Sequence, residues 1–170
     1  MVRRCLAGLL MALLAPLVVA VDGSTEIPAF PDYTLTTLDG SSQVSIADFR
    51  GRPVLLTFWA SWCGPCRVEL PELQKLYGEL AGDGFVLLTV NVDVSPTFAT
   101  RFLAQLGISV PVYRMHQNDL VSLGVSSLPT NILLDRDGRP VQLFTGYSPA
   151  LPQEIRRLVG EMASGEDRVS

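Results

Sequence analysis

The chain has 170 residues, an ordinary globular composition and a formal net charge of −4, so it is long enough for one domain with a sizeable core. Its basic residues are scattered, which argues against a nucleic-acid footprint, and it contains no repeats or low-complexity tracts. Two of its three cysteines form a Cys-x-x-Cys motif, and the third lies near the N-terminus.

The first residues have the pattern of a secretory leader. Arg3 and Arg4 precede an uncharged apolar run at 5–21, and small residues lie near its end at Ala20. This pattern predicts a signal peptide that is cleaved after Ala20. The alternative is an uncleaved N-terminal membrane anchor, for which the run is barely long enough. Under either alternative, residues 1–20 place the domain in a periplasmic or other extracytoplasmic compartment, which is oxidising.

A short polar linker at 21–30 leads into the first predicted strands. Alternating side chains at 33–38 predict a strand, and Asp-Gly at 39–40 is a hairpin turn signal. Residues 43–45 then pair back, and residues 46–49 form one helical turn. The chain therefore begins its folded part with a β-hairpin.

Strands and helices alternate through the rest of the chain. The predicted elements are a strand at 54–59, a helix at about 63–80, a strand at 85–92, a helix from 95 to 107, a strand at 110–113, a helical turn at 120–123, strands at 131–134 and 140–144, and a helix at 149–162. Pro71 lies inside the first long helix and is expected to bend it. The second helix is expected to bury four apolar side chains, namely Phe98, Phe102, Leu103 and Leu106. This order predicts an α/β fold with a central mixed β-sheet flanked by helices, and a polar, disordered tail at 163–170.

The Cys-x-x-Cys motif lies where the strand at 54–59 meets the first long helix. Cys63 and Cys66 can close a small disulfide there, and a helix N-terminus favours a thiolate. Two other interpretations are half of a zinc site and a purely structural disulfide. Zinc would need two more ligands, which besides carboxylates are limited to His116 and Cys5. The motif therefore favours redox chemistry.

Several segments carry a resemblance to a known family. Residues 58–66, Phe-Trp-Ala-Ser-Trp-Cys-Gly-Pro-Cys, resemble the thioredoxin superfamily. The segments 35–40, 46–53 and 69–73 narrow the resemblance to the TlpA/ResA-like extracytoplasmic thiol-disulfide oxidoreductases of bacteria. It implies a thioredoxin-like fold with an added N-terminal β-hairpin, in a domain at 31–162.

Cysteine order and helix geometry indicate the catalytic roles, and the resemblance agrees with them. Cys63 is the expected nucleophile, with a pKa lowered toward about 7, and Cys66 is the resolving thiol. Where thioredoxins have a buried aspartate, this chain has Thr57, which cannot act as a base. Glu69 is the expected replacement as proton acceptor, because it follows Cys66 by three residues on one helix face. The alternative is that Glu69 is a solvated carboxylate, and Glu72 is a weaker candidate for the same duty.

The resemblance also points to substrate-binding residues. Pro129 matches the cis-proline that faces the motif in the superfamily, and Leu128 before it would pair its backbone with the substrate chain. Trp62 is expected to lie partly exposed beside the cysteines and to line the substrate surface. Trp59 is expected in the core.

The spacer between the cysteines bears on the redox potential. Gly64 and Pro65 form the thioredoxin spacer, which is associated with a potential near about −270 mV and favours a reductant. No metal or other cofactor is expected besides the redox-active disulfide. Met115 and His116 resemble a fragment of a copper site, but a surface loop or ordinary packing is the simpler interpretation.

The resulting prediction is a protein-disulfide reductase, secreted or anchored at the membrane. The resemblance supplies possible clients, apocytochrome c or copper-centre proteins, and a membrane thiol-electron donor. Three alternatives stay open, namely a disulfide oxidase or isomerase, a thiol peroxidase, and a non-catalytic metal-binding module.

Overall fold

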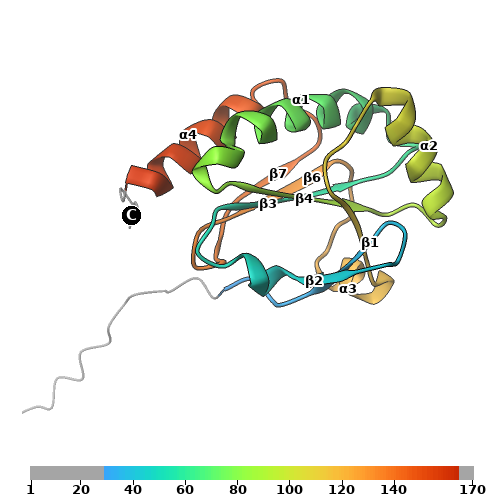
Figure 1. Ribbon diagram of the computed structural model, residues 1–170, viewed down its shortest axis with the longest axis horizontal. Coiled ribbons are helices and arrows are strands. Elements are labelled where there is room, and N and C mark those ends of the chain that lie inside the picture. The colour runs from blue at the N-terminus through green and yellow to red at the C-terminus, as the bar shows by residue number, and fades with distance from the viewer. Residues whose placement is uncertain (1–28, 165–170) are drawn as a thin grey trace, which may run out of the picture.

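The structure is a computed structural model, and it describes residues 29–164 (Figure 1). The elements are β1 (Thr34–Thr37), β2 (Gln43–Ser45), the short 3-10 helix η1 (Ile46–Phe49), β3 (Val54–Trp59), α1 (Gly64–Leu80), the 3-10 turn η2 (Ala81–Asp83), β4 (Val86–Asn91), α2 (Pro96–Leu106), β5 (Val112–Met115), α3 (Gln117–Ser122), β6 (Thr130–Leu134), β7 (Pro140–Thr145) and α4 (Leu151–Ser164). The predicted leader, most of the linker and the end of the tail lie outside these residues. Within them, no helix combines the length and apolar character needed to cross a membrane.

The strands form one mixed sheet with the order β2-β1-β5-β4-β3-β6-β7. The pairs β3–β4 and β4–β5 are parallel, and the remaining neighbours are antiparallel. All six residues of the central strand β3 are buried, as the continuous apolar run predicts for a strand covered on both faces. The predicted mixed sheet and N-terminal hairpin are confirmed.

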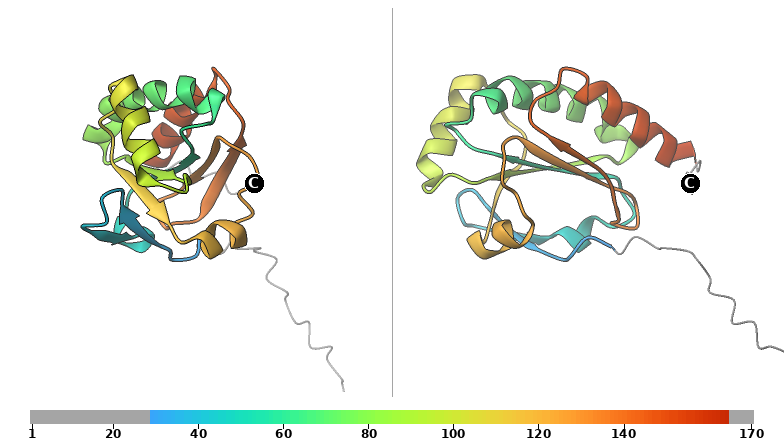
Figure 2. Two further views of the ribbon diagram at one scale, coloured as in Figure 1. Left: turned by 90° about the vertical axis from the view of Figure 1, so that its right-hand side faces the viewer. Right: turned by 180° about the vertical axis from the view of Figure 1, so that it is seen from behind.

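Helices cover both faces of this sheet. Figures 1 and 2 show α1, α2 and α4 on one face, and α3 with η1 on the other. Alternation along β3 explains the two cores, because successive side chains of a strand point to opposite faces. Leu55 packs with Leu73 of α1, whereas Leu56 packs with Ile46 of η1 and Leu120 of α3.

The structure corrects the predicted burial of α2. Phe98 is 53% exposed, whereas Ala99 and Phe102 are buried. The buried face of α2 is formed by residues 99, 102, 103 and 106. At 100° per residue, Phe98 lies about 90° around the helix axis from the centre of this face. The first apolar residue of the helix was therefore wrongly assigned to the core.

Three predicted boundaries are also wrong. The helix predicted at 149–162 runs two residues later, as α4, so residues 163 and 164 belong to this helix and not to the predicted tail. The strand predicted at 110–113 runs over β5, two residues later, where its residues pair with β4 and β1. The helical turn predicted at 120–123 starts earlier, because His116 caps α3 by accepting the N–H of Asn118 on Nδ1. The predicted bounds of α1 and the inclusion of Pro71 in it are confirmed.

Candidate active site

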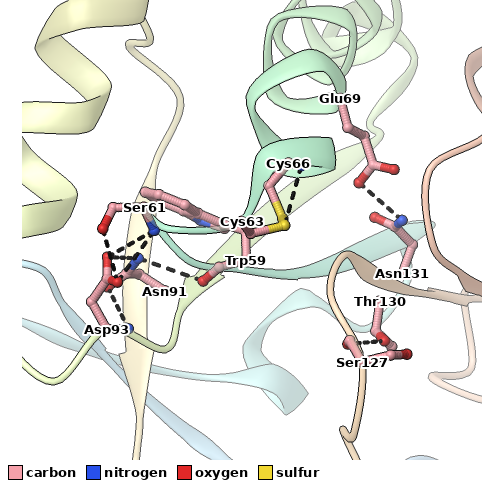
Figure 3. The surroundings of a disulfide bond; sticks show 10 residues. All are labelled: Trp59, Ser61, Cys63, Cys66, Glu69, Asn91, Asp93, Ser127, Thr130 and Asn131. Atoms are coloured by element: carbon pink, nitrogen blue, oxygen red, sulfur yellow. Dashed lines mark hydrogen bonds between the residues drawn. A yellow bond between two sulfur atoms is a disulfide. The ribbon is translucent and has the colours of Figure 1, made fainter.

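The two cysteines lie at the junction of β3 and α1 and form a disulfide (Figure 3). Cys63 is the N-cap of α1, with extended backbone at φ −83° and ψ 107°, and its Sγ accepts the N–H of Cys66 at 3.2 Å. N-cap side chains accept from the second or third helical N–H. Pro65 occupies the second position and has no N–H, so the donor is the third residue, Cys66.

Burial distinguishes the two sulfur-bearing side chains. Cys63 is 5% exposed and Cys66 is fully buried, so Cys63 is the more accessible of the two. An anion at the N-cap is stabilised by the helix dipole, typically by about 0.3–1 kcal/mol. The lowered pKa of Cys63 and the two catalytic roles stay predictions.

Glu69 lies one turn beyond Cys66 and is buried, with 1% of its surface exposed. Burial, together with the negative charge of Glu72, raises the pKa of Glu69 to about 7, although a hydrogen bond from Asn131 opposes this. Asn131 donates its Nδ2 to Glu69 Oε1 at 3.1 Å. A side chain in this position is not the solvated helix carboxylate of the alternative interpretation.

A short hydrogen-bonded chain connects Glu69 to the central strand. Thr57 of β3 donates its hydroxyl to Asn131 Oδ1 at 2.8 Å, and Asn131 of β6 donates in turn to Glu69. Thr57 and Asn131 are direct partners in the β3–β6 register. Thr57 is no base, as expected, but it orients the amide that contacts Glu69. Sequence reasoning missed Asn131, whose one signal is an amide inside an apolar strand.

A second polar cluster lies on the other side of the disulfide (Figure 3). Asp93 is 3% exposed and follows β4. Its carboxylate accepts the N–H of Ser61 at 3.2 and 3.1 Å, the Ser61 hydroxyl at 3.0 Å and Asn91 Nδ2 at 2.9 Å. The cluster therefore fixes the backbone just before Cys63. It was also missed, although a polar Asn-x-Asp at the end of a buried strand was a usable signal.

The aromatic residues lie where the sequence places them. Trp62 is 72% exposed, whereas Trp59 is fully buried and stacks on Phe102 with ring centroids 5.3 Å apart. The Arg67 guanidinium lies over the Phe102 ring at 4.7 Å, a cation–π contact that joins α1 to α2. Trp59, Phe102 and the two cysteines belong to one apolar cluster.

The Leu128–Pro129 peptide bond is cis, as predicted. Leu128 is half-buried and packs against the cluster that contains both cysteines, which brings this loop to the redox pair. Roles for Leu128, Pro129 and Trp62 in substrate binding stay predictions, as do the redox-tuning roles of Gly64 and Pro65. In the part of the chain that the structure describes, no three His, Cys, Asp or Glu side chains are grouped to hold a metal ion.

Comparisons with known proteins agree with this geometry. The Redoxin family matches residues 25–157. Thiol-disulfide oxidoreductase ResA of Halalkalibacterium halodurans is 34% identical over 130 residues, covering 75% of this chain and 73% of that protein. A crystal structure from Chlorobium tepidum, described as a thiol:disulfide interchange protein DsbE, has a TM-score of 0.72 and 31% identity, covering 79% of this chain and 95% of the other. A secreted thiol-disulfide isomerase from Corynebacterium glutamicum has a TM-score of 0.69 and 29% identity, covering 79% and 84%.

Proposed function

The chain belongs to the Redoxin family and is a thiol-disulfide oxidoreductase, and from this premise we propose that it works as a reductant of protein disulfides. The observation that carries the proposal is the Cys63–Cys66 pair at the start of α1, with the buried carboxyl group of Glu69 one turn farther along the same helix. A dithiol with a buried carboxyl group one helical turn beyond its buried member has the groups that disulfide reduction requires.

The reaction proceeds in two exchanges. In the first, the Cys63 thiolate attacks one sulfur of a client disulfide, the client S–S bond breaks, and the other client sulfur leaves as a thiolate. In the second, the Cys66 thiol gives its proton to the Glu69 carboxylate, and the resulting thiolate attacks Cys63 Sγ. The mixed disulfide breaks, the second client sulfur leaves as a thiolate, and the Cys63–Cys66 disulfide forms. Two electrons pass from the dithiol to the client.

The pKa of Glu69 suits this duty. A general base works best when its pKa lies near the operating pH, and burial raises the pKa of Glu69 to about 7. At neutral pH a substantial fraction of Glu69 is therefore ionised and able to accept the Cys66 proton.

Client binding is assigned to the surface around the disulfide. Trp62 offers an exposed indole beside Cys63, and Leu128 offers its backbone on the neighbouring cis-proline loop. An extended client segment would pair with this backbone as a short added strand.

The proposed site of action is outside the cytoplasm, with residues 1–20 as signal peptide or anchor. The secreted isomerase among the structural relatives supports this location. Because such a compartment is oxidising, a reductant there needs a dedicated membrane thiol-electron donor. Apocytochrome c and copper-centre proteins are the proposed clients, since both require reduced cysteines.

The decisive experiment is the reduction potential of the Cys63–Cys66 pair in protein lacking residues 1–20, measured against a defined thiol buffer. A value below about −230 mV supports a reductant, and a value above about −180 mV would turn the assignment to an oxidase or isomerase. Cys66→Ser should trap a client as a mixed disulfide, and Cys63→Ser is the matched control that should not. Consumption of peroxide by the purified protein would favour a thiol peroxidase. A function that survives Cys63→Ser, together with copurification of stoichiometric copper or zinc, would favour a non-catalytic metal-binding module.

A further inference from the structure

Two further side chains, one from α1 and one from the segment between β7 and α4, belong to the surroundings of Glu69. Glu72 follows Glu69 by three residues and so shares its face of α1. Tyr147 comes from the segment between β7 and α4, and its hydroxyl donates to Glu72 Oε1 at 3.2 Å. Both side chains are half-buried. The Glu72 carboxyl group and the Tyr147 hydroxyl group therefore lie between the buried Glu69 and solvent.

Hydrogen bonding leaves one oxygen of each carboxyl group unmatched. Asn131 satisfies Glu69 Oε1 and Tyr147 satisfies Glu72 Oε1, but both Oε2 atoms are buried and accept no hydrogen bond from residues 29–164. Buried carboxyl oxygens in natural proteins are normally hydrogen-bonded. One proton held between the two groups would turn two unmatched acceptors into a donor and an acceptor.

The electrostatic couplings support this proximity. The negative charge of Glu72 acts to raise the pKa of Glu69. The pKa of Tyr147 is raised by burial first, and then by the charges of Glu72 and, to a smaller extent, Glu69. The polar and titratable groups coupled to Glu69 are thus Glu72 of α1, the neutral amide of Asn131 from β6, and Tyr147, and Cys66 precedes Glu69 by one turn of α1.

We propose that Glu69 and Glu72 hold one proton between them, with Tyr147 anchoring Glu72, so that the proton taken from Cys66 leaves toward solvent by way of Glu72. The inference rests on the proposed role of Glu69 as proton acceptor. Glu72 carries the proton onward from Glu69, and Tyr147, which acts through Glu72, is a positioning residue.

The proton is accounted for at each step. The Cys66 thiol transfers it to the Glu69 carboxylate, Glu69 passes it to the Glu72 carboxylate, and Glu72 releases it to water. The electron pair that remains on Cys66 forms the new bond to Cys63 Sγ. The departing client thiolate takes its own proton from solvent.

The test is Glu72→Gln, with Glu79→Gln as the matched control. Glu79 lies on the same helix but is exposed and paired with Arg156, so its loss removes one charge without touching Glu69. Carboxyl carbon NMR of oxidised protein follows the titration of Glu69 directly. We expect a lower Glu69 pKa in Glu72→Gln, because the like charge beside it is gone, and the wild-type titration in Glu79→Gln.

Tyr147→Phe is a second variant that keeps the test valid if Glu72→Gln does not fold. Without the tyrosine hydroxyl, Glu72 is no longer anchored beside the site, so its charge acts less on Glu69 and the Glu69 pKa falls by less than in Glu72→Gln. In stopped-flow resolution of a mixed disulfide near pH 7, Glu72→Gln should be about tenfold slower than wild type, below the 10²–10⁴-fold typical of losing a general base.

The outcomes separate this inference from the proposed function. A Glu69 titration unchanged in both Glu72→Gln and Tyr147→Phe overturns the shared proton. If Glu69→Gln still slows resolution in that case, the proposed function stands alone. If Glu72→Gln shifts the titration while Glu69→Gln leaves the resolution rate unchanged, the role of Glu69 fails and the exit route fails with it.

Discussion

The stability of the oxidised Glu69→Gln variant, relative to that of wild type, should be greater at neutral pH than at acidic pH. The pKa of Glu69 is about 7 in the folded protein, against an ordinary value of 4.5. The folded state therefore keeps this proton between about pH 4.5 and 7, whereas the unfolded chain releases it. Since the folded state then binds more protons, raising the pH across this window destabilises wild type.

The magnitude follows from the same two pKa values. A pKa raised by about 2.5, at 1.36 kcal/mol per pKa unit, corresponds to about 3 kcal/mol. Glutamine keeps an oxygen for the Asn131 amide to donate to, but it carries no titrating proton. Below about pH 4.5 the full contribution of protonated Glu69 is present, and above about pH 7 the loss is complete.

Urea unfolding of wild type and Glu69→Gln from pH 4 to 8.5 measures this difference. The free energy of unfolding of the variant minus that of wild type should rise by about 3 kcal/mol across the window and be flat on either side. Glu79→Gln, an exposed control on the same helix, should show no such rise. A difference for Glu69→Gln that stays constant with pH would show that the Glu69 carboxyl group titrates normally in the fold, and the argument from burial would be wrong.

Three further substitutions test other parts of the site. Asn131→Ala removes the hydrogen bond that lowers the pKa of Glu69. The pKa of Glu69 should therefore rise above about 7, by about 1–2 units for the loss of a hydrogen bond to a charged group, and carboxyl carbon NMR measures this rise. Asp93→Ala leaves the partly buried Ser61 N–H without its acceptor and should cost about 1–3 kcal/mol in urea unfolding. A loss under about 1 kcal/mol would mean that the cluster does not hold the loop. Trp62→Ala should change the free energy of unfolding by no more than about 0.5 kcal/mol, because the indole is exposed. The same substitution should slow the reduction of a protein client more than that of a small disulfide. Equal slowing of both reactions would show that Trp62 does not contact the client.

The sequence predicts those parts of the site that depend on local spacing. The Cys-x-x-Cys motif, the start of α1 and the helical face shared by Cys66 and Glu69 all follow from positions within seven residues of one another. The cis bond before Pro129 was reached through family resemblance, because spacing alone gives a low chance of cis.

Contacts between distant strands were beyond sequence reasoning. Asn131 reaches Glu69 because the β3–β6 register sets it opposite Thr57, and a shift of one residue would turn it to the other face of the sheet. Asp93 meets Ser61 because β4 lies parallel to β3 and both end at the same edge. Phe98 was misplaced for a related reason, since only the packed helix shows which arc of α2 faces the core.

The N-cap at Cys63 is predicted to influence the reduction potential of the pair. A thiolate at this cap has one backbone donor from its own motif, the Cys66 N–H, because Pro65 removes the other. An oxidant such as DsbA owes its high potential to a well-stabilised reduced form. We expect a cap with half of its donors to support the reduced form less, so that the dithiol gives up its electrons more readily. On this reasoning Pro65, which removes one donor from the thiolate, is predicted to make the pair a better source of electrons.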